Sequence, residues 1–167
     1  ACVAGRYQDQ NAAPDYECKR CGIGLYGDAT KSTKATACKE CPKGRWSAVI
    51  GYGITSETAC TVCSKGKYND QPRQYTILAC KDCDAGTFNN ASGSQAKSSC
   101  KLCNAGTYNT KSGSIDISSC FECNTGKFST KSSSQTSDDC KACPIGQNQP
   151  VTGQTSCNEN LCKCPSG

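Results

Sequence analysis

One frame of cysteine, glycine and aromatic residues recurs about every 20 residues, and it constrains the fold more than any other feature of the chain. The frame is C-x-x-G-x-aromatic, followed by about ten variable residues and a closing C-x-x-C. It opens at Cys2, Cys21, Cys41, Cys63, Cys83, Cys103 and Cys123. Its glycines are Gly5, Gly24, Gly44, Gly66, Gly86, Gly106 and Gly126, and its aromatic residues are Tyr7, Tyr26, Trp46, Tyr68, Phe88, Tyr108 and Phe128. A fixed period of this kind predicts a tandem array with one small structural unit per repeat.

The frame divides the chain into eight repeats and the start of another. We expect the boundaries 2–20, 21–40, 41–62, 63–82, 83–102, 103–122, 123–142 and 143–161, with residues 162–167 opening a truncated further repeat. Repeat 8 diverges, because Asn148 stands where the aromatic residue is expected and its closing cysteine, Cys157, comes early. As in other solenoid-like arrays, we expect each repeat to contact only its sequence neighbours. Because the pattern is already under way at both ends, we expect a processed chain or a segment of a longer protein.

The composition leaves little material for an apolar core. The 167 residues include 18 cysteines, and Leu, Ile, Val and Phe together number only 18, about 11% of the chain. Below about 20%, a chain needs another source of order. The longest weakly apolar stretch, around residues 48–54, is too short to cross a bilayer, so we expect no membrane span in this segment. Covalent or metal cross-links must therefore replace the missing core.

The variable part of each repeat is rich in Ser, Thr, Asn, Gly and Lys, which favours turns between two short extended legs. The frame glycine suits a positive φ or a close backbone approach. The aromatic residue two positions later is expected to lie over the neighbouring cross-link and to supply most of the apolar burial. The predicted fold is an array of small disulfide-rich repeats, mostly coil with short β-hairpins and little or no helix. Eight units of about 10 Å would make a rod on the order of 80 Å.

Zinc is the strongest alternative to disulfides as the cross-link. Cys18, Cys21, Cys38 and Cys41 have the C-x2-C…C-x2-C spacing of a four-thiolate site. Each such site needs two C-x-x-C pairs, however, and the chain has seven pairs and an unpaired Cys2. Zinc would therefore leave one pair and Cys2 without a site. Redox catalysis is a weaker alternative, because nothing in the polar loops would tune a reactive thiolate.

Disulfides account for more of the pattern, because Cys2 then behaves as the second cysteine of a pair and bonds forward. The simplest connectivity is Cys2–Cys18, Cys21–Cys38, Cys41–Cys60, Cys63–Cys80, Cys83–Cys100, Cys103–Cys120, Cys123–Cys140 and Cys143–Cys157, with Cys162 and Cys164 unassigned. Bonding within each C-x-x-C pair and crossed patterns stay open at this point. A framework this dense implies an oxidising compartment, so we expect a secreted, extracellular or cell-surface protein.

The frame C-x-x-G-x-[Y/F]…C-x-x-C resembles the extracellular repeats of ephrin-receptor-like cysteine-rich regions. It is also similar to the first module of tumour-necrosis-factor-receptor repeats and to the repeats of protist surface proteins such as ciliate immobilisation antigens. The resemblance covers residues 2–146 and implies the forward pairing, for example Cys83–Cys100 with Gly86 and Phe88. The second tumour-necrosis-factor-receptor module is missing. The resemblance is specific for architecture rather than for function.

No residue pattern points to catalysis. The chain has no His, and the neighbouring carboxylates Asp138 and Asp139 would point to opposite faces of an extended segment. We therefore expect no enzyme, no metal and no cofactor. Lysines that directly follow the first cysteine of a pair could form a basic row that meets acidic polysaccharide, although a solvated face is the better interpretation: Lys19, Lys39, Lys81, Lys101 and Lys141. Nucleic acid is disfavoured, because the aromatic residues belong to the frame.

Two functions follow from this pattern. The first is a structural one, in which a stapled rod serves as a spacer or as a subunit of a surface coat, appendage or filament, with self-association or other surface proteins as partners. The alternative is a ligand-binding segment of a receptor or adhesin, and its predicted interface is the apolar loop of repeat 3, formed by Trp46, Ile50, Tyr52 and Ile54. The sequon at Asn90 predicts an N-linked glycan. The Ser- and Thr-rich segments 110–114 and 129–137 are candidates for O-linked sugar.

Overall fold

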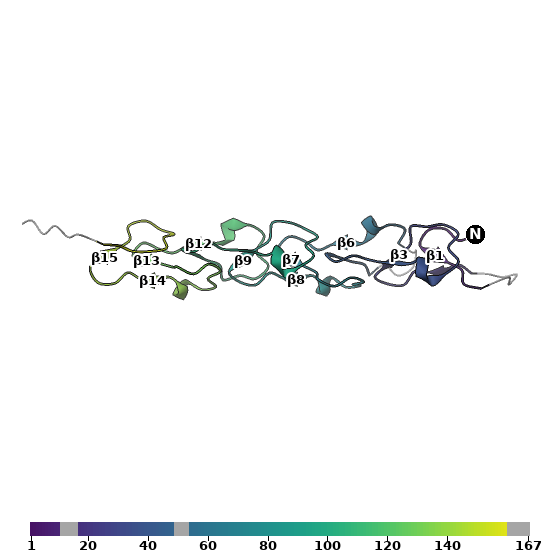
Figure 1. Cartoon of the computed structure of the whole chain (residues 1–167), viewed down its shortest axis with the longest axis horizontal. Helices are drawn as coiled ribbons and strands as arrows, with labels where there is room; N and C mark the ends of the chain where they lie inside the picture. The colour runs from purple at the N-terminus through teal and green to yellow at the C-terminus, as the bar shows by residue number, and fades with distance from the viewer. Residues whose placement is uncertain (11–16, 49–53, 160–167) are drawn as a thin grey trace, which may run out of the picture. The chain divides into compact units, whose positions relative to one another are not determined.

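The structure is a computed structural model that describes residues 1–10, 17–48 and 54–159. Within them the predicted fold class is confirmed: eight consecutive antiparallel two-stranded hairpins follow one another, and no α-helix is present. Figure 1 labels many of these strands along the chain. The hairpins are β1–β2 (Arg6–Tyr7, Lys19–Arg20), β3–β4 (Leu25–Tyr26, Lys39–Glu40), β5–β6 (Arg45–Trp46, Thr61–Val62), β7–β8 (Lys67–Tyr68, Lys81–Asp82), β9–β10 (Thr87–Phe88, Lys101–Leu102), β11–β12 (Thr107–Tyr108, Phe121–Glu122), β13–β14 (Lys127–Phe128, Lys141–Ala142) and β15–β16 (Gln147–Asn148, Asn158–Glu159).

A single 3-10 turn precedes the closing cysteine in six of the repeats. The turns are η1 (Ala35–Ala37), η2 (Glu57–Ala59), η3 (Ile77–Ala79), η4 (Lys97–Ser99), η5 (Ile117–Ser119) and η6 (Ser137–Asp139). In η1 the N–H of Cys38 donates to the carbonyl of Ala35, and the other closing cysteines of this group that have a described cap repeat the bond. The turn therefore sets the position of the cysteine immediately before the chain enters the second strand.

Eight disulfides among the described residues each join the cysteine that opens a repeat to the next cysteine along the chain. They are Cys2–Cys18, Cys21–Cys38, Cys41–Cys60, Cys63–Cys80, Cys83–Cys100, Cys103–Cys120, Cys123–Cys140 and Cys143–Cys157. This is the forward connectivity. All four cysteines of the zinc alternative form disulfides, and a sulfur held in a disulfide offers no thiolate to a metal. Cys162 and Cys164 lie outside the described residues.

The chain divides into two compact units. Unit 1 comprises Ala1–Lys81 with Ala91–Ser99, and unit 2 comprises Asp82–Asn90 with Cys100–Gly167. Unit 1 contains β1–β2, β3–β4 and β5–β6, and unit 2 contains β9–β10, β11–β12, β13–β14 and β15–β16, while the division falls within β8. Each unit is described by itself below.

Main-chain hydrogen bonds join consecutive repeats within each unit in one constant pattern. The N–H of the frame glycine donates to the carbonyl of the residue that follows the aromatic position of the next repeat. In unit 2 the N–H of Gly86 donates to Asn109 (2.7 Å) and that of Gly106 to Ser129 (2.8 Å), and in unit 1 the N–H of Gly44 donates to Asn69 (2.8 Å). The carbonyl of the same glycine accepts from the frame cysteine of the next repeat, as between Gly86 and Cys103 (2.9 Å). The junction therefore depends on backbone atoms rather than on any particular variable side chain.

The repeats also contact their second neighbours, which corrects the expectation that they contact only adjacent ones. In unit 1 a methyl group added to Gly24 of repeat 2 would lie 2.6 Å from the carbonyl oxygen of Arg73 in repeat 4. In unit 2 the same close approach joins Gly86 of repeat 5 to Ser133 of repeat 7. The frame glycine is therefore required for two reasons: its φ is positive, and no Cβ fits beneath the backbone that passes over it.

The interior of each unit consists mainly of disulfides and polar side chains, with few apolar ones. Seven frame cysteines are at most 8% exposed: Cys2, Cys21, Cys41, Cys63, Cys83, Cys103 and Cys123. Among the frame aromatics only Tyr68 and Phe88 are buried, and the other five are half-buried, so the aromatic residue supplies less of the interior than expected. The residue that follows it is buried instead in repeats 3–8: Ser47, Asn69, Asn89, Asn109, Ser129 and Gln149.

Candidate functional site: the repeat junction and its surface

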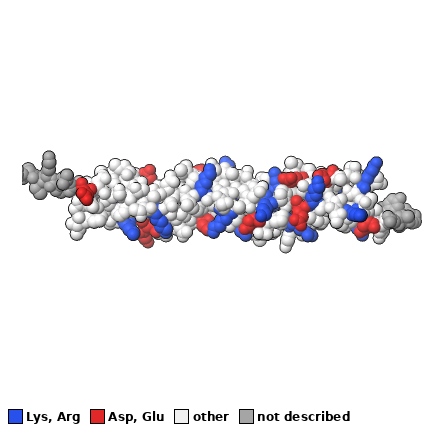
Figure 2. All heavy atoms as spheres, in the orientation of Figure 1, with Lys and Arg blue, Asp and Glu red and all other residues white. Residues whose placement is uncertain are grey.

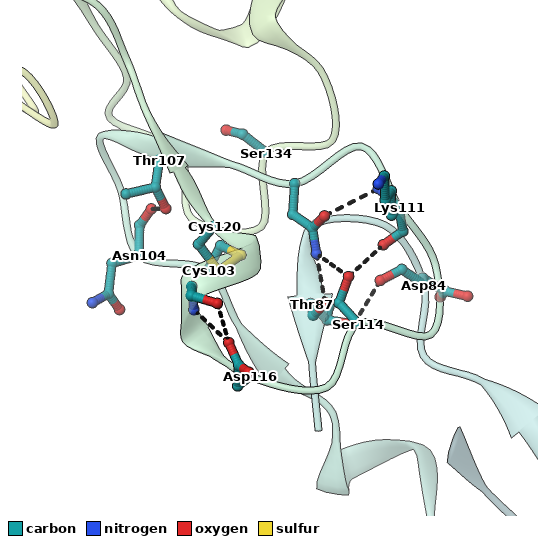
Figure 3. Close-up of a disulfide and its surroundings, with 12 residues drawn as sticks. Asp84, Thr87, Cys103, Asn104, Thr107, Lys111, Ser114, Asp116, Cys120 and Ser134 are labelled. Atoms are coloured by element: carbon teal, nitrogen blue, oxygen red, sulfur yellow. Dashed lines mark hydrogen bonds between the residues drawn. A yellow bond between two sulfur atoms is a disulfide. The ribbon is translucent and has the colours of Figure 1, made fainter. Parts of the chain in front are cut away.

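The buried amide of Asn109 links two repeats of unit 2. Its Nδ2 donates to the carbonyl of Thr87 in the preceding repeat and to Oγ of Ser114 in its own repeat, both at 2.9 Å. Its Oδ1 accepts from the N–H of Lys111 at 3.0 Å. Figure 3 labels the three partners, Thr87, Ser114 and Lys111. All three bonds are made by a side chain with no exposed surface. A buried amide that is fully hydrogen-bonded in this way fixes the register of its neighbours, because any slip would leave polar atoms unpaired.

The same arrangement recurs in unit 1 at Asn69. Its Nδ2 donates to the carbonyl of Arg45 in the preceding repeat (2.9 Å), and its Oδ1 accepts from the N–H of Gln71 (3.0 Å). Ser129, at the corresponding position of repeat 7, reaches only Ser134 and Lys131 of its own repeat. Asparagine at this position therefore adds a side-chain bond to the preceding repeat that serine is too short to make.

The sequence analysis missed this position. The signal was present, because three successive repeats carry Asn directly after the aromatic residue, at Asn69, Asn89 and Asn109. Its meaning could not be derived from one chain, since a polar residue between a strand and a loop is ordinarily assigned to a turn. Three side chains of the Ser- and Thr-rich segments proposed for O-linked sugar are also at most 8% exposed and lie in this buried region: Ser114, Ser129 and Ser134.

Three of the five lysines in the predicted basic row form ion pairs with an aspartate of their own repeat. Lys19 pairs with Asp9 (2.8 Å), Lys39 with Asp28 (2.7 Å) and Lys81 with Asp70 (2.9 Å), all in unit 1. In unit 2 the Nζ of Lys101 donates to Oδ1 of Asn90 at 3.2 Å. The partner always lies seven residues after the frame cysteine, a relationship that was not recognised in the sequence.

The three lysine–aspartate pairs shift the pKa of both partners in the directions expected for exposed ion pairs. The hydrogen bond from Lys81 lowers the pKa of Asp70 below 3.8, and the hydrogen bond to Asp70 raises the pKa of Lys81 above 10.5. Basic and acidic side chains are interspersed on the face shown in Figure 2. Surface pairs of this kind contribute little stability and offer no unbalanced charge to a polyanion.

Two of the residues in the predicted interface of repeat 3 can be placed. Trp46 is half-buried, and Ile54 is 6% exposed, with its carbonyl accepting from the N–H of Gly27 at 2.8 Å. Ile50 and Tyr52 lie outside the described residues. Groups of exposed apolar side chains lie in repeat 4, at Tyr75, Ile77 and Leu78, and in repeat 6, at Ile115, Ile117 and Phe121. The latter group includes a ring contact between Phe121 and Tyr108, whose centroids lie 6.0 Å apart.

The remaining predicted positions lie at the surface. Asn90 is exposed, and its Nδ2, the atom to which an N-linked sugar would be attached, does not make the bond to Lys101. Asp139 accepts from the N–H groups of Gln135 and Thr136, and these bonds lower its pKa, whereas Asp138 is exposed. The Asp139 carboxylate thus belongs to the capping box of a 3-10 turn, and the two aspartates do not form a catalytic pair. Over residues 1–10, 17–48 and 54–159, no group of three His, Cys, Asp or Glu side chains could hold a metal ion, and no helix could span a membrane.

Comparison with known proteins adds no family to this description: the chain matches no protein-family model and no curated protein. The architecture itself is that of tandem, small, disulfide-bonded cysteine-rich repeats, each with one β-hairpin. Repeats of this size that rely on disulfides in place of an apolar core are typical of proteins from oxidising extracellular environments. They are also typical of non-enzymatic proteins with structural or ligand-binding roles.

Proposed function

We propose that the protein is a non-enzymatic extracellular structural protein, in which a rod of stapled repeats acts as a spacer or as a subunit of a surface coat, appendage or filament. One observation carries this proposal: within each unit the same backbone bonds join one repeat to the next. Gly24, Gly44, Gly86 and Gly106 each donate to the following repeat while the sequence between the frames varies. A constant junction between repeats whose surfaces vary is what a spacer needs.

Small-angle X-ray scattering on dilute, non-reduced protein tests the proposal. We expect a maximum dimension on the order of 80 Å, as for units of about 10 Å stacked in a row. Limited proteolysis of the same sample should leave the chain intact until a reductant is added. A globular scattering curve, with a radius of gyration of about 15 Å, would contradict the proposal, because a compact particle of this length cannot act as a spacer.

The second candidate is a ligand-binding segment of a receptor or adhesin, similar to the ephrin-receptor-like regions named above. The observation that favours it is the exposed apolar group of repeat 4, where Tyr75, Ile77 and Leu78 are 54%, 59% and 84% exposed within four residues. Exposed clusters of aromatic and aliphatic side chains mark many interfaces. A foreign protein that binds the wild-type protein and not the variant Leu78→Ser would support this candidate. A ligand that binds both proteins equally well would show that this surface is not the binding site.

A further inference from the structure

One asparagine of repeat 5 lies in a sequence that oligosaccharyl transferases recognise. Asn90, Ala91 and Ser92 form the motif N-x-S, and no other asparagine of the chain is followed two residues later by Ser or Thr. The motif lies in the loop between β9 (Thr87–Phe88) and η4 (Lys97–Ser99). Asn90 and Ser92 are both exposed. The acceptor side chain and the hydroxyl that is recognised with it therefore both reach solvent in the folded repeat.

The position of Asn90 is one at which the repeats leave a side chain at the surface. It is the seventh residue after the frame cysteine, directly after the buried position occupied by Asn89. Seven of the eight residues at this position are exposed, and Asp70 is half-buried: Asp9, Asp28, Ala48, Asp70, Asn90, Thr110, Thr130 and Pro150. A large substituent at this position projects into water and displaces no packed group.

The amide of Asn90 is held through its oxygen and not through its nitrogen. The Nζ of Lys101 in β10 donates to Oδ1 of Asn90 at 3.2 Å, and no described residue accepts from Nδ2. In repeats 1, 2 and 4 the aspartate at this position accepts from the corresponding lysine in the same way. Attachment of a sugar to Nδ2 leaves Oδ1 available as an acceptor, so Lys101 keeps its partner. The position thus combines an anchored side chain with an accessible nitrogen.

Backbone hydrogen bonds hold the chain on both sides of the motif. The N–H of Asn89 donates to the carbonyl of Ser114 at 2.9 Å within unit 2. The N–H of Gly93 donates to the carbonyl of Cys63 at 2.8 Å within unit 1. Neither bond uses the side chain of Asn90, so a sugar attached to it leaves both of them intact.

We propose that Asn90 carries an N-linked oligosaccharide, transferred from a lipid-linked pyrophosphate oligosaccharide of the secretory pathway. In the transfer a bond forms between Nδ2 and C1 of the first sugar, the bond between C1 and the pyrophosphate oxygen breaks, and one proton leaves Nδ2. Neither reactant is oxidised or reduced, and the lipid pyrophosphate is the leaving group. The inference rests on the extracellular location in the proposed function. It makes this loop of repeat 5 a solvent-facing surface of any coat or filament that the protein builds.

Intact mass spectrometry of the native, non-reduced protein tests the modification. We expect one step of mass loss in most molecules when an amidase specific for N-linked sugar is added. The amidase leaves an aspartate in place of Asn90, so the reaction in heavy-oxygen water labels the peptide that contains this position. An aspartate there can pair with Lys101 as Asp70 pairs with Lys81, so the repeat should stay folded after the sugar is removed.

Variants of the whole chain, secreted from cells that perform N-glycosylation, separate the motif from the contact with Lys101. Ser92→Ala removes the recognised hydroxyl and leaves Asn90 and its bond to Lys101 in place, and it should abolish the mass loss as completely as Asn90→Gln does. Ser92→Thr should keep the modification. The matched control is Asn104→Gln, which should keep the full mass loss, because Asn104 is also exposed but is followed two residues later by Gly106.

The inference is overturned by native protein that loses no mass in most molecules, by heavy-oxygen label on a peptide without position 90, or by a mass loss that persists in Ser92→Ala. Small-angle scattering of the same native sample distinguishes this failure from a failure of the structural function. An elongated particle without N-linked sugar would overturn the modification alone. A compact particle that carries sugar on Asn90 would overturn the spacer and support the modification.

Discussion

Replacing Asn109 by alanine is the sharpest perturbation of the repeat junction. The substitution removes bonds to Thr87, Ser114 and Lys111 from a site without solvent access. At a net value of about 1 kcal/mol for each hydrogen bond, the expected loss is about 3 kcal/mol. Because the disulfides stay intact, we expect this loss as local opening of the junction between repeats 5 and 6 rather than as global unfolding.

Hydrogen exchange at the amide of Gly86 measures that opening, because this N–H donates to the carbonyl of Asn109. A loss of about 3 kcal/mol corresponds to exchange on the order of a hundredfold faster. Asn109→Ser should fall between wild type and Asn109→Ala, since Ser129 shows that serine keeps contacts within its own repeat. The control is Asn104→Ala, an exposed asparagine of the same repeat, which should change the rate little. Exchange in Asn109→Ala within about threefold of wild type would refute the reasoning, because the amide would then contribute less than about 1 kcal/mol.

Three further predictions follow from the same contacts. Gly86→Ala should lower the midpoint of chemical unfolding more than Gly126→Ala. Gly126 has the same left-handed φ but no described residue within 4 Å of an added Cβ, so its substitution should lose only about 1–2 kcal/mol. Equal losses would show that the close approach at Gly86 does not matter. The pKa of Asp70, titrated by NMR, should rise toward 3.8 in Lys81→Gln. In wild type the contribution of Asp70 to folding stability is present above pH 3.8 and is lost as pH falls through its lowered pKa. The contribution of Lys81 to folding stability is present below pH 10.5 and is lost as pH rises through its raised pKa. Full reduction should abolish the protection of the hairpin amides from hydrogen exchange, because each disulfide stabilises the fold by about 3 kcal/mol. A reduced chain that keeps this protection would show that the polar interior is enough to hold the hairpins together.

Much of the fold follows from the frame alone. The repeat period, the hairpins and the scarcity of helix all derive from the spacing of Cys, Gly and aromatic residues, and the pairing of Cys2 with Cys18 follows from a cysteine that opens a frame without a C-x-x-C partner. The positive φ at the frame glycine was likewise expected from its position after the cysteine. These features are local, so the physical chemistry of one repeat determines them.

The features that could not be predicted are those that join one repeat to another. The contact of Gly24 with Arg73 spans two repeats, and the bond from Asn109 to Thr87 crosses a junction. A period in the sequence fixes how often a unit recurs but not the rotation between units, and that rotation decides which positions meet. The ion pair between Lys81 and Asp70 is a simpler case, because the two residues recur together at one spacing and could have been recognised as partners.

Backbone atoms and side chains have different roles in the junctions, which explains why the residues outside the frame vary from repeat to repeat. Main-chain atoms make the constant bonds of each junction, so a variable residue can change without altering them. Two kinds of position cannot change in this way: the cysteines that close the loops and the glycines over which a backbone passes. The residue after the aromatic position is buried in repeats 3–8 and varies only among Ser, Asn and Gln there. An array built on these positions can gain or lose whole repeats while every junction keeps the same chemistry. Length is then set by repeat number rather than by the details of any repeat, which is the property that a molecular spacer requires.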